Sequence, residues 1–157
     1  MACYAANYAA LSGTYDADGN PDRWHGAATI PGSFPDGTST TILFAEKYAT
    51  CVSASPHYAF RGGSLWAWPN PDAAFSPTFA SFNNGPGSLF QIQPANDQIH
   101  MESLCDSSRA STGHSAGMQV CMADGSVRLL ASTVQPNIWW AFCTPAGQET
   151  IPDDGIP

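Results

Sequence analysis

The stretch from Gly113 to Ala131 constrains the fold most, because it has the pattern of a β-hairpin. Asp124-Gly125 lies between two runs rich in apolar and β-branched residues, and Asp-Gly readily adopts the positive φ angles of a type I′ turn. A two-residue turn sets Ala123 opposite Ser126 and fixes the register of the other pairs. This register predicts that two sets of side chains lie on opposite faces of the hairpin. One set is Val120, Met122, Val127 and Leu129, and the other is Gln119, Cys121, Arg128 and Leu130.

Three further segments have the patterns of strands. Thr40–Ala49 is predicted to be a mostly buried strand that ends at Glu46 and Lys47. Residues 58–68 form a second predicted strand, in which Gly62-Gly63 indicates a bulge or a close approach of another backbone. Residues 90–93 form a third, short strand that ends at Pro94.

The two ends of the chain have helical spacing of unequal strength. Pro136 suits a first helical turn, and Trp139, Trp140 and Cys143 lie three to four residues apart, which predicts a helix over Pro136–Cys143 that stops before Pro145. Between Ala2 and Ser12 the spacing of Tyr4, Tyr8 and Leu11 fits either a short helix or an irregular packed arm.

The order of three segments resembles a known family. They are 36–48, which reads Asp-Gly-Thr-Ser-Thr-Thr-Ile-Leu-Phe-Ala-Glu-Lys-Tyr; His114 followed after nine residues by Asp124-Gly125; and 136–149. Together they resemble a large family of secreted bacterial proteins related to the pseudopilins of type II secretion. The resemblance implies an α+β fold, with a small antiparallel sheet, long ordered loops and a short C-terminal helix.

The resembling family begins with a prepilin-type cleavage site and a long apolar helix. No positively charged start, apolar helix or processing site precedes Ala2. We therefore expect residues 1–157 to form one pseudopilin-like domain that lacks the N-terminal membrane and polymerisation helix.

The composition of the chain limits which kinds of molecule it can bind and in which compartment it is expected. The 157 residues carry a net charge of −8 with only five Lys and Arg, which argues against nucleic acid and anionic membrane surfaces as partners. No run approaches the eighteen or so apolar residues of a membrane span. We expect a secreted, periplasmic or cell-surface protein, whose partners are other pilin-like subunits or copies of itself.

Five cysteines allow up to two disulfides in pairings that the sequence does not rank. None has the Cys-x-x-Cys spacing of a zinc site. In an exported domain, Cys51 and Cys105 lie in loop-like sequence and could form a bridge, whereas Cys121 and Cys143 are expected to be buried thiols.

An acidic loop is the candidate metal site. Asp16, Asp18, Asn20 and Asp22 alternate around Gly19, and calcium prefers six to eight such oxygen ligands. The spacing resembles the first half of an EF-hand loop, although Ala27 stands where the bidentate Glu would be. The alternative is a plain surface turn, since these residue types are also ordinary turn formers. The acids of residues 97–106 are a second possible source of calcium ligands.

The candidate catalytic residues are Ser115, His114 and Asp124. Gly113–Gly117 matches the Gly-x-Ser-x-Gly pattern of a nucleophile elbow, but an elbow needs a buried strand before the serine and a helix after it. A base for Ser115 would have to be His25, His57 or His100, because His114 is adjacent in an extended chain. Asp124 fits a turn residue better than a partner of His114, since ten extended residues separate them.

Three functions follow from these residues. The first is a calcium-stabilised structural domain related to type II secretion pseudopilins. The second is a calcium-dependent hydrolase of small esters or lactones, because the sequence also resembles a metagenome-derived N-acyl-homoserine-lactone hydrolase with a pseudopilin-like fold, a quorum-quenching activity. The third is a glycan-binding module that uses Trp24, Trp66 and Trp68, although five tryptophans can equally all lie in the core.

Overall fold

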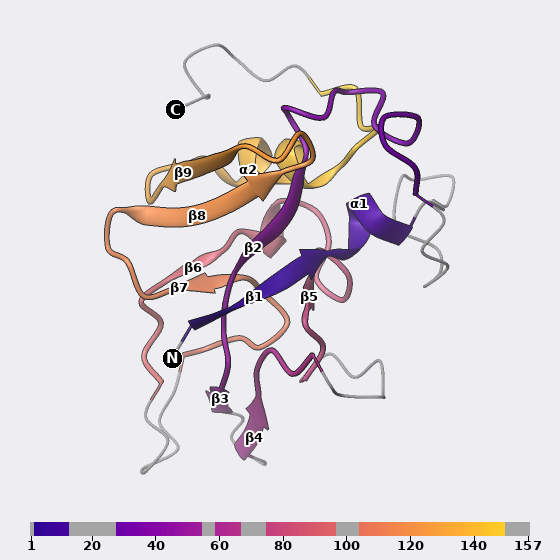
Figure 1. Cartoon of the computed structure of the whole chain (residues 1–157). Helices are drawn as coiled ribbons and strands as arrows, with labels where there is room; N and C mark the ends of the chain where they lie inside the picture. The colour runs from indigo at the N-terminus through magenta and orange to yellow at the C-terminus, as the bar shows by residue number, and fades with distance from the viewer. Residues whose placement is uncertain (1, 13–27, 55–58, 67–74, 97–103, 150–157) are drawn as a thin grey trace.

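A five-stranded sheet organises the molecule (Figure 1). The computed structural model describes residues 2–12, 28–54, 59–66, 75–96 and 104–149. The strand order is β5-β1-β2-β8-β9, and all neighbours are antiparallel except the parallel pair β1 and β5. The strands are β1 (Ala2–Asn7), β2 (Ile42–Tyr48), β5 (Thr78–Phe79), β8 (Gly117–Met122) and β9 (Val127–Ala131).

Among the described residues, two small sheets and three short helices complete the α+β fold, which confirms the expected class. Strands β3 (Cys51–Ala54) and β4 (Ala59–Gly62) are antiparallel, and β6 (Gln91–Ile92) and β7 (Ser111–Thr112) are parallel. The helices are α1 (Tyr8–Ser12), the 3-10 turn η1 (Pro86–Ser88) and α2 (Pro136–Cys143). Within the described residues no helix has the length and apolar character needed to span a bilayer.

The core lies on the face of the sheet that α2 covers. Trp139 of α2 is fully buried, with its ring 5.7 Å from Phe79 and 5.1 Å from Phe90. Its indole N–H donates to the carbonyl of Ser88 at 3.0 Å, so the polar end of this large side chain is satisfied. The structure confirms the predicted helix from Pro136 to Cys143, and Trp139 is the residue through which it seals the core.

The predicted hairpin is present, but its predicted register is wrong. The amide of Gly125 donates to the carbonyl of Met122, and Gly125 has φ of 84°, so the loop contains three residues and not two. A type I turn followed by glycine in the left-handed region produces this loop. Val120 therefore faces Arg128, one position away from the prediction, and the side chains of β9 exchange faces.

The exchange of faces explains the burial pattern of β9. Leu130 is buried with Met118, Val120 and Met122, whereas Val127 and Leu129 are exposed.

The amino-terminal segment differs most from expectation. Residues 2–7 form β1, which pairs with β2 on one side and β5 on the other, and the helix α1 covers only Tyr8–Ser12. The spacing of Tyr4, Tyr8 and Leu11 suggested a helix or an irregular arm. The segment forms a strand instead, in which every second side chain points into the core, such as that of Ala5, which is fully buried.

The other predicted strands are found at β2, β4 and β6, each shorter than expected. Gly63 has φ of 150°, and a Cβ there would lie 2.0 Å from the carbonyl oxygen of Ala49, so a close backbone approach requires glycine.

Cys51 and Cys105 form the disulfide that was considered, and Cys143 is a buried thiol. Cys121 is only partly buried, because the register places it on the outer face.

Asn7 joins three elements inside the core. Its side-chain amide donates to the carbonyls of Ile42 at 2.7 Å and Cys143 at 2.8 Å, while its oxygen accepts from the amide of Ala10. The side chain is fully buried, so any lost bond leaves polar groups without water. Asn7 thereby ties β1 to β2 and to the end of α2.

We expect Asn7→Ala to lower the free energy of unfolding by about 2–4 kcal/mol, because it leaves two buried carbonyls without a donor and opens a small cavity. Urea denaturation measures this loss. The exposed Asn84 is the matched control, and Asn84→Ala should change stability by less than about 0.5 kcal/mol. Equal effects of the two substitutions would contradict the role assigned to Asn7.

Candidate functional site

The three candidate catalytic residues lie at two ends of strand β8. His114 and Ser115 are exposed in the loop between β7 and β8, and Asp124 is exposed in the hairpin loop after β8. The six residues of β8 separate these loops by roughly 20 Å at the ordinary rise of a strand. The structure therefore brings His114 and Ser115 into one loop and leaves Asp124 apart from them.

Asp124 acts locally, within its own turn. Its carboxylate accepts hydrogen bonds from the hydroxyl of Ser126 at 2.6 Å and from the Ser126 amide at 2.8 Å, and both lower the pKa of Asp124. Its own amide donates to the carbonyl of Thr38 at 3.0 Å, which fixes the hairpin against the loop before β2. These bonds are typical of a turn aspartate.

The acidic partner of His114 is Glu46, which the sequence reasoning missed. The Nε2 atom of His114 lies 3.4 Å from Oε1 of Glu46. The side chain of Glu46 is only 7% exposed, whereas that of His114 is 66% exposed. A buried carboxylate thus holds an imidazole that reaches solvent.

Polar groups from β7 and β8 complete the surroundings of Glu46. The hydroxyl of Thr112 donates to Oε2 of Glu46 at 2.5 Å, and the amide of Gln119 lies 3.4 Å from the same oxygen. Thr112 also accepts from the amide of His114 at 3.1 Å. We call Glu46, Thr112, His114 and Gln119 the Glu46 cluster. It fastens the connection between β7 and β8 to the middle of the sheet.

The sequence reasoning missed Glu46 because it took Glu46 and Lys47 as the end of a strand. Both residues instead lie inside β2, which ends at Tyr48, so the two charged side chains point to opposite faces of the sheet. Glu46 and Lys47 are 6% and 1% exposed. Two consecutive charges within an apolar run were the available signal.

Lys47 is the second buried charge of β2. Its ammonium group donates to the carbonyls of Ser76 at 2.7 Å and Thr78 at 2.9 Å, which ties β2 to β5 across β1. Burial lowers the pKa of Lys47 to about 8, an effect that the negative charge of Asp106 partly offsets. Of the other titratable groups in the core, Cys143 has its thiol pKa raised by burial.

Ser115 has no hydrogen-bond partner within the described residues. Strand β8 begins two residues after Ser115, at Gly117, whereas a nucleophile elbow needs a helix there. His25, His57 and His100, the three candidate bases, lie outside the described residues.

The candidate calcium ligands Asp16, Asp18, Asn20 and Asp22 also lie outside the described residues. Within the part that the structure describes, no group of three or more His, Cys, Asp or Glu could hold a metal ion. Asp106, the described acid of residues 97–106, uses one oxygen to accept from the amide and hydroxyl of Ser108.

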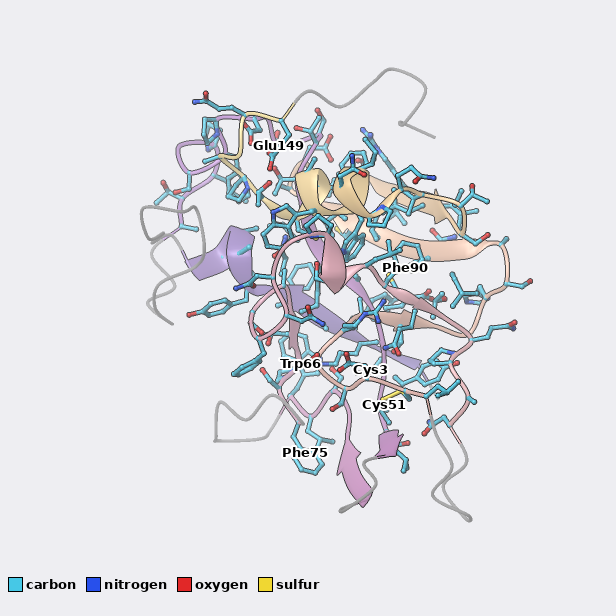
Figure 2. All side chains as sticks on the ribbon, turned by 180° about the vertical axis from the view of Figure 1, so that it is seen from behind. Cys3, Cys51, Trp66, Phe75, Phe90 and Glu149 are labelled. Carbon is cyan, nitrogen blue, oxygen red and sulfur yellow. A yellow bond between two sulfur atoms is a disulfide. The ribbon has the colours of Figure 1, made fainter. Side chains whose placement is uncertain are left out.

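Of the three tryptophans considered for glycan binding, Trp66 is described and is 56% exposed. Its indole N–H donates to the carbonyl of Tyr4 at 2.8 Å, and it projects at the molecule's surface (Figure 2). Trp24 and Trp68 lie outside the described residues.

Lys47 predicts a specific pH dependence of stability. With a folded pKa of about 8 and an unfolded value of 10.5, the folded state loses its proton first, so stability rises with pH between these values. Relative to Lys47→Met, the wild type should gain about 3 kcal/mol between pH 7 and 11.

Urea denaturation of both proteins across this range measures the difference. Cys143 acts in the opposite sense, since its unfolded thiol ionises first, but it is present in both proteins and cancels in the comparison. Parallel pH profiles for the wild type and Lys47→Met would contradict the depressed pKa.

Comparison with known proteins gives one match. A family model described as "Protein of unknown function (DUF1559)" matches residues 5–137, from β1 to the first residues of α2. No curated protein and no solved structure matches the chain significantly. The matched region covers most of the chain, with four strands of the main sheet and the second half of β1. The chain belongs to the DUF1559 family of pilin- and pseudopilin-like bacterial proteins.

Proposed function

We propose that this chain is an exported structural domain of a pilin-like, secretion-related assembly, and that calcium stabilises it. The observation that carries the proposal is the family match over residues 5–137. The segments that resemble pseudopilins supply the framework: 36–48 contains β2, 114–125 contains β8 and its turn, and 136–149 contains α2. The resemblance therefore concerns residues that build the fold.

The disulfide between Cys51 and Cys105 supports an exported protein. It closes a loop of 54 residues and links the start of β3 to the segment before β7. Such bridges persist in oxidising compartments and are rare in the cytosol. The compartment that fits is therefore periplasmic, cell-surface or extracellular.

The proposed calcium ligands are the side chains of Asp16, Asp18, Asn20 and Asp22. These residues lie between α1 and β2 in the sequence, and an ion bound by all four would crosslink this segment in the folded state. Oxygen ligands at alternating positions suit calcium because it accepts variable geometry.

Calcium should raise the melting temperature of the chain. At 100 times the dissociation constant, binding to the folded state stabilises it by about 2.7 kcal/mol, or roughly 5–10 °C for this length. Differential scanning fluorimetry with calcium and with a chelator measures the shift. The triple variant Asp16→Asn, Asp18→Asn, Asp22→Asn should lose it, whereas Asp153→Asn with Asp154→Asn should retain it. A shift of equal size in all proteins would refute the assigned ligands.

A hydrolase of small esters or lactones is the second candidate, and the pairing of His114 with Glu46 favours it. A buried carboxylate that orients an exposed imidazole is the arrangement of a general base. The base would act on water, or on Ser115 of the same loop if the loop changes conformation. The ring opening of an N-acyl-homoserine lactone would then consume one water, break the ring's acyl C–O bond and give a single open-chain product that carries both the new carboxylate and the new hydroxyl group, with one proton released.

Lactone turnover separates the two functions. If the chain is a hydrolase, His114→Ala and Glu46→Gln should each lower kcat/KM at least about 100-fold, because general-base catalysis contributes this much. Ser115→Ala should have the same effect only if Ser115 is the nucleophile. Ser126→Ala is the control outside the loop.

The proposed structural function predicts no turnover above a heat-denatured sample by any of these proteins. Turnover that every variant retains would indicate a contaminating enzyme and would leave the hydrolase without support. Turnover lost in His114→Ala and Glu46→Gln alone would replace the structural proposal.

A further inference from the structure

The two edges of the main sheet are unlike one another. β5 is only two residues long and both are buried, which protects that edge. β9 has five residues in an unbroken register with β8, and Val127 and Leu129 are 69% and 41% exposed. β9 contains no proline or bulge, and Arg128 is its one charged residue, whereas proteins commonly block open edges with prolines, bulges or charged side chains.

Alternate backbone groups of β9 point away from the sheet. The amide of Met122 donates to Ser126, and the amide of Ser132 donates to Ala116, so the even-numbered residues of β9 form the ladder with β8. Val127, Leu129 and Ala131 therefore direct their N–H and C=O groups outward. Among the described residues, no further hydrogen bond reaches the backbone of Val127 or Leu129.

We propose that β9 pairs with β9 of a second copy of this chain, in an antiparallel contact whose two-fold axis passes through Leu129. The two five-stranded sheets then form one sheet of ten. Leu129 of each copy lies opposite Leu129 of the other, and Val127 lies opposite Ala131. All outward groups then face outward groups, so hydrogen bonds form between them. The carbonyl of Ala131 already accepts from the amide of Val134 at 3.1 Å, so it would accept its second hydrogen bond from the other copy.

Charge and geometry favour this register. An axis through Arg128 would place two like charges directly opposite, which is destabilising. An axis between two residues would set outward backbone groups against inward ones. With the axis at Leu129, Arg128 faces Leu130.

A second copy is the occupant that suits the edge. β9 carries no acidic residue, so the net charge of −8 on each copy is not concentrated at the contact. The edge is also self-complementary, since the same outward groups and the same leucine serve both copies. A contact of this length buries less than about 1,200 Å² in total, so the dimer should be weak. The inference goes beyond the proposed structural function and does not depend on calcium or on catalysis.

Sedimentation equilibrium between about 10 μM and 1 mM is the first test, over the range in which so small an interface should dissociate. Leu129→Pro removes an outward N–H and keeps the ladder with β8, so it should abolish the dimer without altering the circular dichroism spectrum. Leu129→Ala retains the N–H and should weaken the dimer less. A wild-type protein that stays monomeric over the whole concentration range would overturn the proposal. This holds also if the monomer binds an added peptide in the extended conformation.

Cysteine crosslinking tests the register and remains informative if the proline variant fails to fold. In a background of Cys3→Ser and Cys121→Ser, Leu129→Cys should form a disulfide-linked dimer under mild oxidation, because the two Cα atoms lie about 5.5 Å apart. Val127→Cys is the matched control, since its two copies lie about 13 Å apart in this register. Crosslinking of both variants to the same extent, or of neither, would overturn the β9 contact.

Discussion

Two consecutive buried charges in the central part of the sheet determine how the rest of the molecule is arranged. Glu46 and Lys47 project from β2 to opposite faces, and a buried charge is tolerated only when it is well hydrogen-bonded. On the outer face, Thr112 and His114 bind the carboxylate of Glu46. On the other face, the carbonyls of Thr78 in β5 and of Ser76, two residues before β5, accept hydrogen bonds from Lys47. Segments far apart in the sequence are thereby held against one strand.

Because of this arrangement, the same residues could serve catalysis and hold the fold together. The pair of His114 and Glu46 could serve a general base, yet each of its contacts also fastens the start of β8. The side chain of Asp124 binds only within its own turn, to Ser126. The family match includes four strands of the main sheet and the second half of β1, and this favours the framework as the property that its members share.

Local patterns predicted those elements whose signals are local. The helix Pro136–Cys143, the position of the hairpin and the strand at β2 follow from residue spacing and turn chemistry. The hairpin register depends on whether Asp-Gly closes a two-residue or a three-residue loop, and that choice reverses the faces of β9. The pairing of β1 with β2 and β5 was not predictable, because partners distant in sequence decide it.

The candidate site was predicted to the same partial extent. His114 and Ser115 were identified from motifs, and the structure places them in one loop. Glu46 was missed, because its burial depends on Thr112 and Gln119 from strands more than sixty residues away. Residue spacing within one segment does not predict a contact between segments that are this far apart in the sequence.

A double-mutant cycle between Glu46 and Thr112 tests most directly whether bonding of the buried charges on β2 holds the fold together. The free energies of unfolding of the wild type, Glu46→Met, Thr112→Val and the double variant give the coupling between the two side chains. We predict a coupling of about 1–3 kcal/mol, because each side chain loses its bond when the other is removed. Additive effects within about 0.5 kcal/mol would contradict the account.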